Sequence, residues 1–269
     1  MKYWIKRSVL PFGIVCLMSM ALFGCGREKK EAVTVQPELV IGSDDYEPYN
    51  YQDENGDYAG VDVELAKEAC RRIGYTPVFK QIQWDDKDIY LENGEVDCAW
   101  GSFSMDGRED DYIWVGPYMY SREVVMVRTD SDIYKLDDLA GKNVAVQSST
   151  QPERIFLGQG YDIIPKVKNV YSFVEMNELF AALRKGYVDA CAGHEIVMQE
   201  YLRQSGQKYR ILDEEIIDSK LGVAFSKNKD TQAEQLRQAM AEMLEDGTVQ
   251  CILEKYGMED RVAAGGITP

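Results

Sequence analysis

The segment Asn93-Gly94-Glu95-Val96-Asp97-Cys98-Ala99-Trp100-Gly101 has an echo later in the chain, Lys185-Gly186-Tyr187-Val188-Asp189-Ala190-Cys191-Ala192-Gly193. Both segments contain a Gly-x-Val-Asp turn followed by small apolar residues. In each, the glycine is placed to end a helix, the aspartate opens a strand, and the strand leads into a loop that contains glycine. Ligands bind open α/β sheets at the carboxyl ends of such strands. The echo predicts two similar lobes, although a chance match of a common αβ turn would look the same.

The rest of the chain alternates between strand patterns and helix patterns, which is typical of an α/β protein with a mainly parallel sheet. In the expected helix at 62–73, apolar residues share one face, Asp62 is a candidate N-cap, and Gly74 is placed to stop the helix. Strands are expected at 38–42, 76–82, 96–100, 123–128, 143–147, 187–192 and 221–225, and helices at 62–73, 175–185, 195–204 and 231–245.

The N-terminal segment has the features of an export signal. Three basic residues precede the apolar run Val9–Phe23, which is too short for a confident membrane span. The run closes on Leu22-Phe23-Gly24-Cys25, which resembles the lipobox of bacterial lipoproteins. We expect residues 1–24 to be removed as a signal peptide and Cys25 to be lipidated, so that the mature chain is anchored to the cell membrane outside the cytoplasm. An ordinary signal peptide or an uncleaved anchor would leave a similar pattern.

Charge and cysteine content exclude several classes of partner. The chain has a formal charge of -16, and loss of the three basic residues in 1–24 would make it -19. Such a surface repels phosphate backbones, so we expect no nucleic acid partner. Four later cysteines show no CxxC spacing and lie in apolar patterns, which predicts buried free thiols at Cys70, Cys98, Cys191 and Cys251. We expect no metal and no cofactor, since His194 has no companion ligands at zinc-site spacing.

A series of short motifs resembles a known family. The segment Asp45–Tyr49 leads through the turn Asp53–Gly56 to the helix start Gly60–Ala66. Further matches are Trp84-Asp85, Gly94–Asp97, Ser102–Arg108, Leu136–Lys142, Val144–Thr150 and Glu245–Thr248. Over 38–258 the chain resembles the bacterial extracellular solute-binding proteins of family 3, the ligand-capturing components of ABC importers for polar amino acids.

The resemblance implies a fold and a domain division. It implies a two-lobe clamshell of the periplasmic-binding-protein type II class, in which each lobe is a mainly parallel sheet flanked by helices. Two hinge strands would cross between the lobes near 120–124 and 218–223. We expect a flexible tether at 25–37, lobe 1 at 38–121 and 222–262, lobe 2 at 122–221, and a flexible tail at 263–269.

Arg108 is the first candidate for ligand binding. A carboxylate that enters an acidic protein needs a fixed planar donor, and guanidinium offers two parallel charge-assisted hydrogen bonds. The resemblance implies that Arg108 clamps the ligand carboxylate. The interval from Ser104 to Arg108 is one residue shorter than is usual in the family, so the loop must be tighter. The alternative is a surface arginine that balances the acidic run 109–111.

Other candidates lie in both lobes. Ser149 and Thr150 precede a helix start near Pro152, where backbone N–H groups favour an anion, and they would complete the carboxylate site. A serine or threonine cap would look the same. The resemblance also places three residues at the ligand's amino and carboxyl groups and two aromatic residues along the side-chain pocket, although either ring could instead belong to the core. These are Gly101, Ser102, Ser104, Tyr46 and Trp84.

The ammonium position departs from the family. Where relatives have an aspartate, this chain has His194 followed by Glu195. A neutral histidine is a poorer ammonium partner than a carboxylate. Glu195 takes the role, or Asp44 helps from the first lobe, or the ligand is not a standard α-amino acid; His194 could also be purely structural.

We therefore expect a monomeric binding protein that captures a small amino acid-like molecule and presents it to an ABC permease in the membrane. We expect no enzyme, because the sequence lacks Gly-x-Ser-x-Gly and His-Glu-x-x-His motifs. A ligand sensor for a signalling partner and a dehydratase-type enzyme on the same fold are the alternatives.

Overall fold

The computed structural model describes residues 36–158, 163–206, 208–263 and 267. The expected export signal, the lipidation site Cys25, most of the tether and most of the tail lie outside these residues. Gln36–Pro269 forms one compact unit. No helix among the described residues has the length and apolar character that a membrane span requires.

One mixed sheet of eight strands organises this unit, in the order β4-β1-β5-β10-β6-β9-β7-β8. At one end β1 is parallel to β4 and β5, and at the other end β7 is parallel to β8 and β9. The long strands β6 and β10 pair antiparallel between these two groups. The bounds are β1 Glu38–Ser43, β4 Thr76–Gln81, β5 Cys98–Ala99, β6 Ile113–Arg128, β7 Asn143–Gln147, β8 Asn169–Phe173, β9 Ala190–His194 and β10 Tyr209–Phe225; β2 Tyr51–Gln52 and β3 Tyr58–Ala59 form a separate hairpin.

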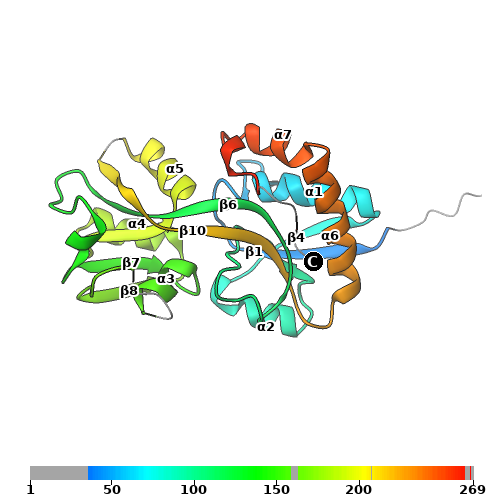
Figure 1. Ribbon diagram of the computed structural model, residues 1–269, viewed down its shortest axis with the longest axis horizontal. Coiled ribbons are helices and arrows are strands. Elements are labelled where there is room, and N and C mark those ends of the chain that lie inside the picture. Colours follow the sequence, from blue (N-terminus) through cyan, green and yellow to red (C-terminus); the bar gives the residue numbers. More distant parts are fainter. Residues whose placement is uncertain (1–35, 159–162, 207, 264–266, 268–269) are drawn as a thin grey trace, which may run out of the picture. The chain divides into compact units, whose positions relative to one another are not determined.

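Helices surround each parallel group, and β6 and β10 run from one group to the other (Figure 1). We call β1, β4 and β5 with their helices the first lobe, and β7, β8 and β9 with theirs the second lobe. The first lobe holds α1 Val61–Ile73, η1 Trp84–Asp86, α2 Lys87–Glu92, α6 Asp230–Glu245, α7 Thr248–Glu254 and η3 Glu259–Arg261. The second holds η2 Leu136–Leu139, α3 Gln151–Phe156, α4 Met176–Arg184 and α5 Glu195–Ser205. This is the two-lobe α/β clamshell that the sequence predicts.

The structure of α1 tests two predictions from the sequence, the N-cap at Asp62 and the helix end at Gly74. Gly74 adopts a left-handed conformation and its N–H donates to the Cys70 carbonyl, so it ends the helix as predicted. The N-cap prediction for Asp62 is wrong, because Gly60 occupies that position. The Asp62 carboxylate instead points into the interior, where it accepts hydrogen bonds from the Ser102 N–H at 2.7 Å and the Tyr118 hydroxyl at 2.8 Å.

The cysteines divide into two groups. Cys70, Cys98 and Cys191 are buried free thiols, as the apolar patterns predict. Cys251 is also free, but the prediction that it is buried is wrong. It lies in α7, which buries Val249, Ile252 and Leu253 and leaves Cys251 on the opposite, exposed side.

Candidate functional site

A cavity lies where strand ends of the two lobes face one another. From the first lobe it is lined by Asp44 and Tyr46, which follow β1, and by the loop 101–104, which follows β5. From the second lobe it is lined by the end of β7, by Ser149 and Thr150 with the first two residues of α3, and by the end of β9. The centre of a water molecule can occupy about 20 Å³ of this space, which is room for about one water. A larger molecule can enter only if the lobes separate.

The structure brings nearly all predicted site residues to this cavity. They come from both lobes although they are spread along the sequence from position 46 to position 194. Residues from the sequence analysis that line the cavity are Tyr46, Trp84, Gly101, Ser102, Ser104, Arg108, Ser149, Thr150 and His194. Glu195 does not line it and is described below.

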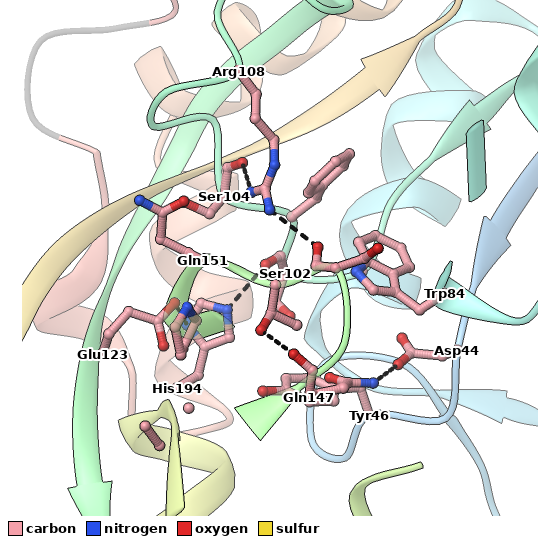
Figure 2. A pocket seen from close by; sticks show the side chains of 17 residues that line it. Asp44, Tyr46, Trp84, Ser102, Ser104, Arg108, Glu123, Gln147, Gln151 and His194 are labelled. Carbon is pink, nitrogen blue, oxygen red and sulfur yellow. Dashed lines mark hydrogen bonds and ion pairs between the residues drawn. The ribbon is translucent and has the colours of Figure 1, made fainter. Parts of the chain in front are cut away.

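Arg108 is buried at the cavity wall and contacts both lobes. Its guanidinium donates to the Ser104 carbonyl at 3.1 Å and to the Ser149 carbonyl at 3.0 Å (Figure 2). The tight loop that the sequence requires is made by Gly107, which has φ +70, and by the Arg108 N–H, which donates to the Met105 carbonyl. Burial lowers the Arg108 pKa, and the charge of Arg154 lowers it further. Because Arg108 is only 7% exposed, the alternative of a surface arginine is excluded.

Two loops at the cavity, one after β5 and one after β7, each contain a residue in a strained backbone conformation. Ser102 has φ 45 and Ser149 has φ 58, and they are the only non-glycine residues with positive φ in the described part of the chain. Both line the cavity, which fits the tendency of backbone strain to collect at functional sites. Gly101 packs closely against Ser43, because a Cβ at position 101 would lie 2.1 Å from Ser43 Oγ and would require that hydroxyl to move.

Ser149 and Thr150 make internal hydrogen bonds at the start of α3. The Ser149 N–H donates to Glu153 Oε2 at 2.7 Å, and the Thr150 hydroxyl donates to the Gln147 carbonyl at 2.6 Å. Thr150 occupies the N-cap position without a side-chain cap hydrogen bond. The Glu153 carboxylate therefore already accepts from the Ser149 N–H, one of the N–H groups that the sequence analysis expected to bind an anion.

Aromatic rings form two sides of the cavity. Trp84 meets Phe103 edge to face with ring centroids 4.9 Å apart, and the Arg108 guanidinium lies 5.2 Å from the Phe103 ring centroid. Tyr46 meets His194 edge to face at 5.9 Å. Tyr46 and Trp84 are both about 5% exposed, so both rings are part of the core. Both also line the cavity, so the two alternatives given in the sequence analysis hold together.

The hydrogen bonds of His194 determine its protonation. Its Nε2 lies 3.1 Å from the Ser102 carbonyl oxygen, which can only accept, so Nε2 carries the proton. In the neutral ring Nδ1 then accepts from the Ser121 hydroxyl at 3.0 Å. Burial lowers the His194 pKa to about 4, so the ring is neutral at pH 7. His194 joins the two lobes but has no nitrogen left for a ligand.

The sequence analysis gives Glu195 as a candidate ligand residue. In the structure it lies outside the cavity and does not line it. It is the first residue of α5 and its carboxylate is directed toward two arginines. Arg122 donates to Glu195 Oε1 at 2.9 Å, and Arg261 donates to Oε2 at 2.6 Å. Both oxygens are therefore engaged by positive charge elsewhere in the protein.

Sequence reasoning did not identify Glu123 as a site residue. Glu123 lies on β6 beside His194 of β9, lines the cavity and has no solvent exposure (Figure 2). Its Oε1 lies 3.3 Å from His194 Nδ1 and accepts from the Ser219 hydroxyl at 3.4 Å. Burial raises its pKa to about 8. The available signal was a carboxylate directly before the apolar run Val124–Val127 in the expected strand 123–128.

Asp44 and Gln147 make another contact between the lobes. Gln147 Nε2 donates to Asp44 Oδ2 at 2.6 Å. Burial raises the Asp44 pKa to about 6, and the hydrogen bond from Gln147 opposes this shift. The closed arrangement is thus held by polar contacts from Arg108, His194 and Gln147, each of which bridges the two lobes.

Two α/β lobes, two crossing strands and a polar cavity between strand ends define the class of two-lobe solute-binding proteins. The chain matches the family described as bacterial extracellular solute-binding proteins, family 3, over residues 39–259, and it belongs to this family. The resemblance seen in the sequence motifs is therefore confirmed.

Relatives of known binding function align along almost the whole chain. The L-cystine-binding protein TcyA of Bacillus subtilis is 27% identical over 271 residues, covering 95% of this chain and 98% of the relative. The histidine-binding periplasmic protein of Escherichia coli is 27% identical over 261 residues, covering 93% and 96%. Among solved structures, an ancestral arginine-binding protein bound to arginine has a TM-score of 0.75 and 28% identity, covering 82% of this chain and 98% of that protein.

Proposed function

We propose that this protein captures an amino acid-like zwitterion between its two lobes and delivers it to an ABC permease. The observation that carries the proposal is the position of Arg108, a buried guanidinium at a cavity between lobes, within hydrogen-bond distance of both. Guanidinium has five N–H donors in a planar fork, and two of them donate to the Ser104 and Ser149 carbonyls. The fork can still meet a carboxylate, and burial strengthens that interaction. The relatives that bind cystine, histidine or arginine support this class of ligand.

Ligand binding would be coupled to closure of the lobes. A ligand shifts the balance between open and closed forms only if it contacts the two forms differently. Arg108 from the first lobe and Thr150 from the second both line the cavity, so a bound molecule would touch both lobes when they close around it. That ligand-bound form would be less tightly closed than the present arrangement, whose cavity has room for about one water. We propose hinges near 120–124 and 218–223, with lobe 1 at 38–121 and 222–262 and lobe 2 at 122–221. The paired strands β6 and β10 support this division, because both cross there.

The place of action would be the outer side of the cell membrane. We propose that Cys25 is lipidated after removal of residues 1–24 and that the segment 25–37 tethers the folded unit to the membrane. The basic start, the short apolar run and the charged segment that follows support this proposal. We propose that the protein acts as a monomer and presents its ligand without converting it.

Calorimetry on the purified chain tests the proposed function. The panel is the twenty standard L-amino acids and L-cystine, titrated into wild type, Arg108→Ala and the control Arg71→Ala. Arg71 is an exposed arginine of α1 paired with Glu68, so its loss removes equal charge without touching the cavity. We expect at least one amino acid to bind wild type and Arg71→Ala equally, and to bind Arg108→Ala about 100-fold more weakly or worse. Equal binding by Arg108→Ala, or no binding of any panel member to wild type, would refute the proposal.

A further inference from the structure

The Glu123 carboxyl group is incompletely hydrogen-bonded inside the protein. Its Oε2 is buried and has no hydrogen-bond partner among the described residues. Its Oε1 has only the long contacts to Ser219 Oγ and His194 Nδ1. Leaving a buried polar group unpaired is costly, and a group kept in that state calls for a functional explanation. The group lines the same cavity as Arg108, so a ligand could reach both.

The other candidates for a cation partner already make polar contacts within the protein. Both His194 nitrogens are engaged, and the ring is neutral. Both Glu195 oxygens accept from arginines outside the cavity. Asp44 accepts from Gln147 across the lobes and so contributes to closure. Of the acidic groups that line the cavity, Glu123 is the one with a buried oxygen that lacks a partner among the described residues.

We propose that Glu123 of β6, rather than His194 or Glu195, receives the ammonium group of the ligand, and that this contact makes the site selective for zwitterions over simple carboxylic acids. The inference rests on the proposed function and adds to it the residue that recognises the cationic end. The guanidinium of Arg108 would hold one end of the molecule and the carboxylate of Glu123 the other. Because Glu123 lies on a strand that crosses between the lobes, the cationic end would sit at the hinge side of the cavity.

Proton release should accompany this contact. Burial raises the Glu123 pKa to about 8, so the free protein holds this group protonated at pH 7, and an ammonium group would favour the ionised form. The charge of Arg108 lowers this pKa and that of Asp106 raises it. Other polar or titratable groups near Glu123 are His194 on β9 with its partner Ser121, Ser219 on β10, and the phenols Tyr46 and Tyr49 in the loop after β1.

The test compares two ligands on two proteins. The probes are the tightest-binding amino acid of the panel and its des-amino counterpart, in which hydrogen replaces the ammonium group. In wild type we expect the amino acid to bind about 100-fold more tightly than its counterpart at pH 7.5. In Glu123→Gln this preference should fall to within about threefold, with the affinity for the counterpart unchanged. The glutamine side chain has the shape of the protonated carboxyl group, so the variant should fold.

Control variants separate Glu123 from the other acidic residues. Glu195→Gln and Asp44→Asn remove the two alternatives that the sequence left open, and each should retain the wild-type ratio of the two affinities. Asp44→Asn should weaken the binding of both ligands equally, because Asp44 lines the cavity and contributes to closure. The wild-type preference should also rise about 20-fold between pH 6 and pH 7.5, because more of the Glu123 population is ionised. A preference that survives Glu123→Gln would overturn the assignment of Glu123 while leaving amino acid capture intact. A preference that is flat with pH in wild type would overturn the proton release and leave the contact itself to the Glu123→Gln comparison. Failure of wild type to bind any panel member would overturn both.

Discussion

Replacing Glu123 with glutamine should make the ligand-free protein more stable at neutral pH. Glu123 is fully buried, and burial raises its pKa from 4.5 to about 8. An acid with a raised pKa in the folded state must keep a proton that the unfolded chain releases above pH 4.5. The folded protein therefore loses stability as pH rises through the window from about 4.5 to about 8.

The size of this effect follows from the linkage between proton binding and unfolding. Each pH unit within the window costs about 1.4 kcal/mol, so Glu123 lowers the free energy of unfolding by about 3 kcal/mol between pH 5 and pH 7. Asp44 and Asp62 have pKa values raised by burial and act in the same direction, whereas the lowered pKa of His194 acts in the opposite direction. These three groups are shared by wild type and Glu123→Gln, so the difference between the two proteins isolates Glu123.

Urea denaturation at pH 5 and pH 7 measures the prediction. The control is Glu95→Gln, which removes an exposed glutamate paired with Lys80 and should follow wild type at both pH values. We expect Glu123→Gln to lose about 3 kcal/mol less than wild type between pH 5 and pH 7. If the two proteins show the same pH dependence, Glu123 is ionised in the free protein, and the proton release that we propose does not occur.

Three further predictions concern other residues of the structure. His194→Ala should lower the free energy of unfolding by about 1–3 kcal/mol, because the Ser102 carbonyl loses a buried donor, yet the preference for an amino acid over its des-amino counterpart should persist; a lost preference would show that His194 contacts the ammonium group. Gln147→Ala removes the bond to Asp44 between the lobes, so small-angle scattering should show a larger open fraction without ligand, and an unchanged profile would contradict that role. Maleimide labelling of the native chain followed by peptide mapping should modify Cys251 well before Cys70, Cys98 and Cys191, and equal labelling of Cys251 and these three buried cysteines would contradict the burial pattern.

The fold was predictable because its signals are local and repeated. The Gly-x-Val-Asp turns at 94–97 and 186–189 precede β5 and β9, and each of these strands leads into the cavity. The glycine at 74 ends α1 because the position needs a left-handed conformation. Nothing local revealed the length of β6 and β10, since strands that cross between lobes change surroundings midway and lose a simple periodic pattern.

Site residues that belong to a short sequence motif were predictable. The roles of acidic residues were less predictable, because residues distant in the sequence determine whether each carboxylate is buried or paired. Arg108 could be found because a short loop motif carries it. Asp62 resembled a helix cap, although its carboxylate binds groups 40 and 56 positions away. Glu195 resembled a ligand residue in the sequence, but in the fold its carboxylate pairs with Arg122 and Arg261, which are distant in the sequence. Glu123 was visible in the sequence as a carboxylate opening an apolar strand, but its burial depends on neighbours from β9 and β10.

A crystal structure of the chain with the tightest-binding amino acid tests the central claim most directly. The account predicts density in the cavity between the lobes, with the ligand carboxylate at hydrogen-bond distance from the Arg108 guanidinium and the ammonium group at hydrogen-bond distance from Glu123 Oε2. An amino acid bound outside this cavity, or bound within it with its carboxylate away from Arg108, would contradict the account.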